Sequence, residues 1–263
     1  MIGSAPLMSP LLKAYEKDCQ ASRPTVPDLS ACLTAAYRHL GRNPDPTFAK
    51  VNRKIIDLLN ADAELGEHAY HNRHHVRDVL FAVVLLLKQT QVAPDGKARV
   101  VECMITTALG HDLHHDGRGT TPTLDLERRS ATAVLEIAQD AGLPPADLGL
   151  IEGLILASYP PKQLKIREKL GLDQAPDPDE LLALMFGEAD VMASLTPEFG
   201  KTLSIALSGE WRKAGRILPS MPDDDAGRVG FLGFYRLMTP AAQALGLDVM
   251  VAEQLQVLQR NVV

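Results

Sequence analysis

Apolar residues recur at every third or fourth position along most of this chain, and one stretch shows the pattern clearly. In NRHHVRDVLFAVVLLLKQT, which begins at Asn72, the apolar positions Val76, Val79, Leu80 and Val83 repeat with a period near 3.6. A helix with one face in a protein core has this period, whereas a half-buried strand alternates strictly. No part of the sequence alternates strictly, so the pattern predicts an all-α fold.

Further helices follow from the same periodicity and from proline and glycine punctuation. The turn chemistry of Ala-Pro-Asp-Gly at 93–96 ends the first helix, and the largely apolar KARVVECMITTALG predicts a buried helix over 97–110. Residues 162–180 are charged and interrupted by prolines, which predicts a surface loop with one helical turn. Residues 218–227 predict a second loop. Other helices are predicted at about 123–141, 145–158, 180–195 and 197–216, with a final pair running to the C-terminus.

The chain of 263 residues shows no internal repeat and no flexible linker that would divide it. We therefore expect one compact multi-helix bundle. In this organisation residues 1–60 form helices that pack on the region 61–263, and they are not an independent domain.

Composition narrows the classes of function. Hydrophobic residues make up 46% and charged residues 23%, as in an ordinary globular protein. The formal net charge of −6 argues against a general affinity for nucleic acid or for anionic membranes. The longest apolar run, residues 79–87, is too short to span a bilayer, and the N-terminal stretch lacks the pattern of a signal peptide. The three cysteines lack metal-binding spacing, so free thiols in a reducing cytoplasm are expected.

Histidines are unevenly distributed along the chain. Seven of the eight lie in two short patches, 68–75 and 111–115, and none follows. Imidazole is the commonest metal ligand and a ready proton donor near neutral pH. His71 and His75 are four residues apart, so on a helix they would share one face. Ordinary surface or hydrogen-bonded positions are expected for His39 and His68. His74 points away from His75 and is expected at the surface or in contact with a metal ligand, and His114 lies off the face of His111 and His115.

The second patch and a distant acid complete a set of metal ligands. His111 and Asp112 stand at the end of an apolar helix, and Asp190 lies among apolar residues in LLALMFGEADVMASL, where an unpaired carboxylate would be costly. With His75 they form a set of two nitrogens and two oxygens, which suits zinc, iron, manganese or cobalt. Asp112 could also bridge to a second ion, and two ions could polarise a phosphoryl group and generate a hydroxide nucleophile.

These residues resemble a known family. An adjacent His-Asp pair after a histidine-bearing helix resembles the HD-domain metal-dependent phosphohydrolases. More narrowly, YHNRHHVRDV resembles the YHNxxHxxDV signature of class I cyclic nucleotide phosphodiesterases, and HDLHHDG resembles their HDxxHxG. Four weaker matches follow in the same order within residues 68–240: LERRS at 126–130, LILAS at 154–158, EADVMASLTP, and VGF at 229–231.

The resemblance implies a function and a metal centre. The expected reaction is hydrolysis of the 3′ phosphoester bond of cAMP or cGMP by a hydroxide that bridges two metal ions. The first ion would be Zn, Fe or Mn, and Asp112 would link it to a second ion, Mg or Mn, which keeps most of its waters. The resemblance implies four ligands for the first ion, His75, His111, Asp112 and Asp190.

Further roles come from the same resemblance. His71 would be the general acid that protonates the leaving O3′. His115 and Glu127 would support catalysis by contacting metal-bound water or by orienting His71. Tyr70 and Asn72 would line the site and hold the metal ligands in place. The partner implied is a small nucleotide, and the sequence leaves a homodimer open.

The chain departs from the family pattern at the base-binding positions. Arg228 stands before VGF, where the family has a glutamine that pairs with the purine edge. It could read the O6/N7 edge of guanine, hold a phosphate of a larger substrate, or be a solvated arginine at a helix start. Phe231 would stack on the base, or lie in the core. Two further departures affect the expected substrate and not the metals. Thr120-Thr121 stand near where the family has an asparagine after HDxxHxG, and Tyr159 stands where it has an acid after LILAT.

Other functions compete with this one. A cyclic dinucleotide, or another nucleotide phosphate, would suit the same phosphohydrolase chemistry. A di-iron oxygenase on an HD scaffold would need further histidine ligands, and none follows residue 115. A nucleotide sensor without activity would be expected to lack a ligand or the general acid, and every one of these residues is present.

Overall fold

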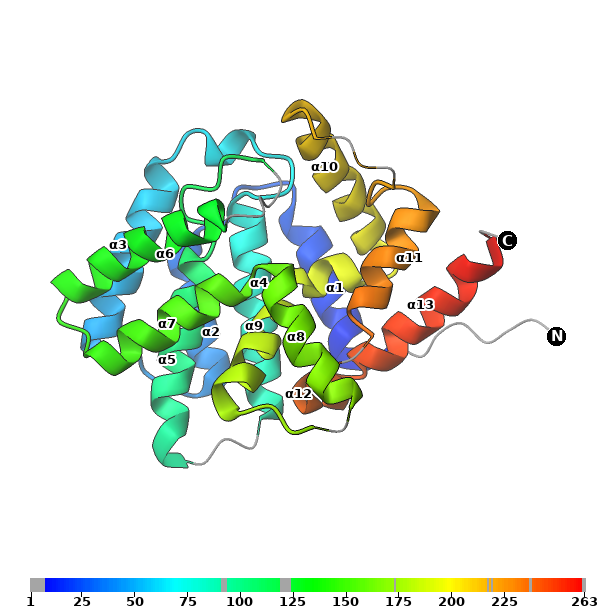
Figure 1. Ribbon diagram of the computed structural model, residues 1–263. Helices are drawn as coiled ribbons and strands as arrows, with labels where there is room; N and C mark the ends of the chain where they lie inside the picture. Colours follow the sequence, from blue (N-terminus) through cyan, green and yellow to red (C-terminus); the bar gives the residue numbers. More distant parts are fainter. Residues whose placement is uncertain are drawn as a thin grey trace.

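The computed structural model describes residues 8–90, 94–118, 124–172, 174–216, 218, 220–236 and 238–261. The all-α prediction is confirmed, because the described residues form thirteen α-helices and one short 3-10 helix, and no strand (Figure 1). The helices are α1 (Pro10–Ser22), α2 (Leu29–Leu40), α3 (Pro46–Ala61), η1 (Leu65–Glu67), α4 (Arg73–Gln89), α5 (Pro94–Gly110), α6 (Asp125–Asp140), α7 (Pro145–Ala157), α8 (Pro160–Gly171), α9 (Pro178–Leu195), α10 (Phe199–Lys213), α11 (Asp225–Phe234), α12 (Pro240–Leu245) and α13 (Leu247–Asn261).

Helix α4 forms the centre of the bundle and packs against α2, α5, α9 and α12 (Figure 1). The apolar positions that predicted this helix, Val76, Val79, Leu80 and Val83, are all buried. Burial of each such side chain contributes about 1.5–3 kcal/mol, so the packing of α4 fixes the frame that carries the histidines.

The N-terminal helices lie against this frame. Helix α1 packs on α4 and α10, α2 packs on α4, and α3 packs on α5 and α6. The Tyr15 hydroxyl donates to the backbone carbonyl of Asp78 in α4 at 3.0 Å. Whether residues 1–60 can fold independently stays a prediction.

Two details of the predicted element order are wrong. Residues 160–171 form helix α8 and not a loop, because Pro160 and Pro161 end one helix and also occupy the first positions of the next, where a missing N–H costs nothing. The final pair of helices is a set of three, because α12 ends at Gly246 in the left-handed conformation before α13 begins. The predicted turn at 93–96 falls partly outside the described residues, and Pro94 begins α5.

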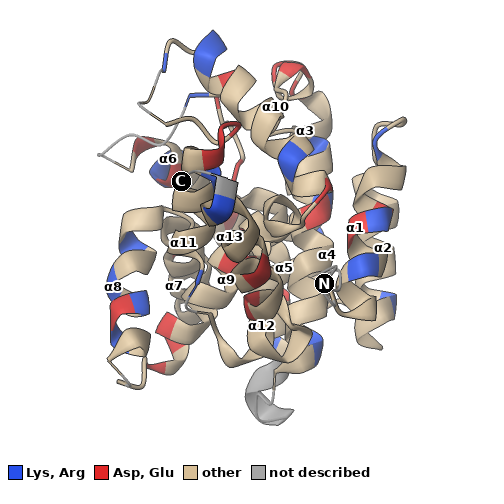
Figure 2. Ribbon diagram, turned by 90° about the vertical axis from the view of Figure 1, so that its right-hand side faces the viewer, with Lys and Arg blue, Asp and Glu red and all other residues tan. Residues whose placement is uncertain are grey.

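Charged residues cover the outer faces of the bundle, and α8 illustrates this clearly. Figure 2 shows positive and negative positions along α8, while its Gln163 and Arg167 side chains are buried against the core. Among the described residues, no helix combines the length and the apolar character needed to cross a bilayer.

Candidate metal centre and active site

Four side chains from distant parts of the chain meet at one point. His75 lies in the first turn of α4, His111 and Asp112 directly follow α5, and Asp190 lies in α9. His75 Nε2 is 3.2 Å from Asp112 Oδ2 and 3.1 Å from Asp190 Oδ1. His111 Nε2 is 3.3 Å from each of these oxygens and 3.2 Å from His75 Nε2. The structure therefore brings together the four residues that the sequence proposes as ligands.

The electrostatics of this group favour a cation. Burial alone would lower the pKa of His75, but Asp112 and Asp190 outweigh it and raise that pKa to about 9. The same two carboxylates raise the pKa of the buried His111 well above its usual value. Burial in turn would raise the pKa of each carboxyl, yet the imidazoles hold both well below the usual range. Two carboxylates at one buried point attract positive charge, as protons or as a metal ion.

The donor set also fits a divalent ion by its spacing. Bonds of about 2.0–2.2 Å from an ion to nitrogen and oxygen place neighbouring ligand atoms about 2.8–3.6 Å apart, from octahedral to tetrahedral coordination. The five spacings given above, 3.1–3.3 Å, fall in this range. Asp112 Oδ2 is buried and accepts no hydrogen bond in the described part of the chain, although the imidazole nitrogens lie close to it. These residues fit a transition metal of the zinc, iron or manganese type.

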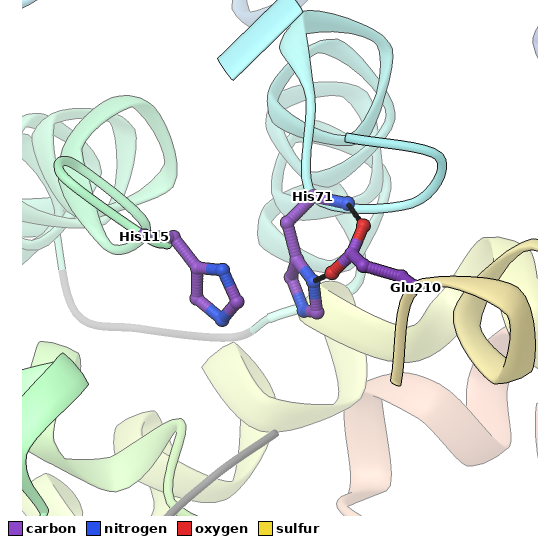
Figure 3. A group of neighbouring side chains, drawn as sticks. All are labelled: His71, His115 and Glu210. Carbon is purple, nitrogen blue, oxygen red and sulfur yellow. Dashed lines mark hydrogen bonds and ion pairs between the residues drawn. The ribbon is translucent and has the colours of Figure 1, made fainter. Parts of the chain in front are cut away.

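His71 is held beside this centre by a carboxylate. The ring nitrogen Nδ1 of His71 is hydrogen-bonded to Glu210 Oε1, and the backbone N–H of His71 donates to Glu210 Oε2 at 3.2 Å (Figure 3). The backbone N–H of Tyr70 donates to the same Oε2 at 2.9 Å. Because Nδ1 is occupied, Nε2 is the ring nitrogen left for a substrate.

The relation of His71 to α4 differs from the predicted one. The sequence placed His71 and His75 on one helix face, but α4 begins at Arg73 with Asn72 as its N-cap, so His71 precedes the helix. The two rings are nevertheless close, with centroids 5.7 Å apart. The bend at Asn72 therefore brings His71 close to His75 although His71 is not part of α4.

His115 and Glu127 lie on the other side of this group. The His115 ring stacks on His71 with centroids 3.8 Å apart and 22° between the ring planes (Figure 3). The backbone N–H of Gly117 donates to His115 Nδ1 at 3.1 Å, so a neutral His115 carries its proton on Nε2. Burial and the nearby His71 lower the pKa of His115 to about 3, which keeps the ring neutral at neutral pH.

Glu127, in the first turn of α6, faces the same carboxylates. Its Oε2 is buried and accepts no hydrogen bond from the described residues. Burial raises the pKa of Glu127, and the negative charges of Asp112 and Asp190 raise it further. An acceptor in this position suits a partner that can donate, such as a bound water.

Tyr70 and Asn72 lie beside the start of α4, which carries His75. The Tyr70 hydroxyl is 2.8 Å from Ser194 Oγ, and its ring centroid lies 5.0 Å from that of His75. Asn72 Oδ1 accepts the backbone N–H of His74 at 2.9 Å, which caps α4, while its Nδ2 donates to the carbonyl of His68 at 2.9 Å. Tyr70 also lines the cavity described next, whereas Asn72 does not.

A cavity of about 230 Å³ opens beside these residues. Tyr70, His71, His115 and Asp190 form its polar side. Helix α10, the α11 segment and Val191 of α9 contribute apolar side chains to its lining. Besides Tyr70, four aromatic side chains line it, namely Trp211, Phe231, Phe234 and Tyr235. Phe231 thus lines the cavity and also packs against the core, so both positions left open by the sequence stay open for it.

Arg228 does not line this cavity. Its guanidinium is buried and donates to the carbonyls of Ser194 at 2.6 Å and Thr196 at 3.1 Å. It also donates to Ser204 Oγ at 3.2 Å and to Gln254 Oε1 at 3.1 Å. The side chain therefore joins the end of α9 to α10 and α13, and it is buried and not solvated.

Sequence reasoning missed Glu210, although a signal for it exists. In α10, Leu203, Ala206, Leu207 and Glu210 follow the spacing i, i+3, i+4 and i+7, which puts them on one helix face. An acid in the last position of an apolar face is buried and needs a partner. That partner is His71, from a segment 139 residues away.

Comparisons with known proteins identify a solved structure with a similar fold. No protein-family model matches the chain, and no curated protein does. Among solved structures, the chain is similar to LmjPDEB1 of Leishmania, determined in complex with IBMX. The TM-score is 0.60 at 17% sequence identity, and the alignment covers 97% of this chain and 87% of that chain. The chain therefore has the all-helical fold of a class I phosphodiesterase catalytic domain.

Proposed function

We propose that this protein is a metal-dependent phosphodiesterase that hydrolyses the 3′ phosphoester bond of a cyclic nucleotide. The observation that carries the proposal is the meeting of two imidazoles and two carboxylates beside a cavity that also contains an oriented histidine. His75, His111, Asp112 and Asp190 would hold the first ion, of the Zn, Fe or Mn type. Asp112 would also reach a second ion, Mg or Mn.

The ions, when bound, would supply Lewis-acid activation of water and neutralisation of charge on the phosphate. The protein's own residues perform the proton transfer. The leaving group of a cyclic nucleotide is an alkoxide, which departs poorly unless it is protonated. His71 would deliver this proton from Nε2, because Glu210 holds Nδ1 and the backbone N–H of the same residue.

His115 and Glu127 would complete the polar side of the site. A neutral His115 with its proton on Nε2 is a hydrogen-bond donor, and its stacking on His71 keeps that ring from rotating. Glu127 Oε2, which accepts no hydrogen bond from the described residues, would accept one from water at the metal centre. Neither role requires a change in the charge of the side chain.

The base would be held by aromatic contact. The cavity walls carry Trp211, Phe231 and Tyr235, and flat aromatic rings suit a purine. The three serines that line the cavity are already hydrogen-bonded, Ser158 to the carbonyl of Ile155, Ser194 to Tyr70 and Ser204 to Arg228. A site of this kind would select a nucleotide by shape and stacking more than by the hydrogen-bonding edge of its base.

A panel of phosphate esters tests the proposal. Protein of known metal content would be incubated with cAMP, cGMP, a cyclic dinucleotide, nucleoside monophosphates and bis(p-nitrophenyl) phosphate, with Mn²⁺ or Mg²⁺ added. We expect 5′-nucleotide from cAMP and cGMP. Release of inorganic phosphate from monoesters alone would contradict the proposal, and preference for the cyclic dinucleotide would replace the substrate while keeping the chemistry.

A further inference from the structure

A second cavity lies in the N-terminal helices, away from the candidate active site. It has a volume of about 680 Å³ and is formed between α2 and α3. Three arginines line it, Arg38 near the end of α2, Arg42 in the following loop and Arg53 in α3. None of its lining residues belongs to the metal centre or to the cavity beside it.

No ion pair neutralises these three arginines in the described part of the chain, although Arg42 lies near Glu102, whose pKa is raised by burial and lowered by the Arg42 charge. Within the described ranges, the side chains of Arg38, Arg42 and Arg53 make no ion pair, whereas Arg23 and Arg99 are each paired with an aspartate. The Arg38 and Arg53 side chains are exposed and that of Arg42 is half-buried, so the three guanidinium groups are open to an anionic ligand. In a chain with a net charge of −6, such a group is a local exception to the overall charge.

The rest of the cavity wall has two characters. Ser30, Thr34 and Arg38 are spaced four residues apart and so lie along one face of α2, which adds hydroxyl groups beside the guanidinium. Leu33 and Ile56 supply an apolar wall. A ligand that matches both characters has an anionic group at one end and an apolar body at the other.

The floor of the cavity is anchored to the core. The hydroxyl of Tyr37, which also lines the cavity, donates to Glu102 in α5. Glu102 accepts the backbone N–H of Asp45 at 3.0 Å as well, in the segment that joins α2 to α3. These bonds hold the two walls in place, so the cavity exists before a ligand arrives and little ordering is needed on binding.

We propose that this α2–α3 cavity binds a small phosphate-bearing ligand of the nucleotide type, at a site separate from the candidate active site. Guanidinium groups match phosphate oxygens with paired hydrogen bonds, and three of them can surround a diphosphate. The apolar wall accommodates the base or sugar. The volume lies within the range of about 300–1,000 Å³ that is typical of small-molecule sites.

Calorimetric titration with ADP and with inorganic pyrophosphate tests this site without any measurement of activity. The test variant is Arg38→Gln/Arg53→Gln, and the matched control is Lys50→Gln/Lys54→Gln. The control removes the same two charges from exposed positions of α3 that do not line the cavity. Circular dichroism verifies that all variants retain their helices. A further variant, Phe231→Ala, alters the cavity beside the metal centre and leaves the α2–α3 cavity intact.

We expect ADP to bind the unmodified protein and the Lys50/Lys54 variant with affinities within about 2-fold of each other, since charge–charge effects at exposed positions are small. The Arg38/Arg53 variant should lose at least about 10-fold, as expected for two charge-assisted contacts. Binding of pyrophosphate with the same dependence on Arg38 and Arg53 supports the phosphate contacts. Equal affinity in both double variants, loss of the binding in Phe231→Ala, or absence of binding by both probes would overturn the proposal.

Discussion

Glu210 binds His71 twice, once at the ring nitrogen Nδ1 and once at the backbone N–H, although the two residues are 139 positions apart (Figure 3). The carboxylate therefore fixes both the position of this residue and the rotation of its ring. A histidine that must deliver a proton to one leaving oxygen needs this kind of restraint.

The first prediction concerns this restraint. Glu210→Gln should lower kcat by about 10- to 100-fold with little change in KM, because partners that orient a functional histidine contribute on this scale. Steady-state kinetics with the best cyclic nucleotide measures the effect, and metal analysis should show an unchanged metal content. Glu198→Gln, an identical substitution at an exposed acid one residue before the same helix, should leave kcat unchanged.

The second prediction concerns proton donation by His71. His71→Ala should keep its metal and lose at least about 10²-fold in kcat toward a cyclic nucleotide. The loss should be much smaller toward bis(p-nitrophenyl) phosphate, because p-nitrophenolate leaves without a proton. Equal losses with both esters would speak against general acid catalysis by this residue. His39→Ala, at an exposed histidine of α2, serves as the control.

The third prediction concerns the metal centre. Asp190→Ala and His75→Ala should each lose bound metal, measured by elemental analysis, while Asp225→Ala at an exposed position should retain it. Chelation should lower the unfolding free energy of the unmodified protein by about 3 kcal/mol or more, since an ion at a hundred times its Kd stabilises by that amount. If Asp190→Ala shows the same response to chelator, the ligand assignment is wrong.

The fourth prediction concerns pH. Hydrogen bonds from His71 and two backbone N–H groups outweigh burial and lower the pKa of Glu210 to about 2. A lowered pKa means that the stabilisation is present above the usual carboxyl pKa and is lost as the pH falls toward about 2. The difference in unfolding free energy between the unmodified protein and Glu210→Gln should therefore shrink between pH 6 and pH 3. Denaturant titrations of both proteins measure it, and a constant difference would contradict the prediction.

The fifth prediction concerns the base. Because the described cavity walls are largely aromatic and the Arg228 guanidinium is already engaged by four acceptors, cAMP and cGMP should be hydrolysed with kcat/KM values within about 5-fold of each other. A site that reads a base by buried hydrogen bonds would discriminate far more strongly. Phe231→Ala should lower both values together. A preference of more than about 50-fold for one nucleotide would contradict stacking as the main contact, even if the phosphodiesterase activity itself is found.

Much of the fold was accessible from the sequence because it depends on local periodicity. The sequence spacing of Val76, Val79 and Leu80 matches the period of an α-helix, so α4 was predictable. Helix α8 was not, because its buried side chains are the polar Gln163 and Arg167 and give no apolar stripe, and its two prolines were interpreted only as a stop signal.

The site follows the same division. Asp190 was found because an acid inside an apolar helix already signals a buried partner. The partnership of Glu210 with His71 depends on how α10 packs against the segment before α4, which no short-range pattern encodes. For Arg228 the sequence indicated its place before VGF but not the orientation of its side chain. That orientation is set by hydrogen bonds to the backbone carbonyls at the end of α9.

Arg228 also limits how this protein can change. To turn toward the cavity beside the metal centre, the guanidinium would have to give up four acceptors on α9, α10 and α13 and in the segment after α9, and α9 carries Asp190. Before a residue at this position could contact a base, other side chains would have to replace the hydrogen bonds that Arg228 makes to these helices. A substitution of Arg228 that changed substrate preference would therefore also destabilise the packing of these helices.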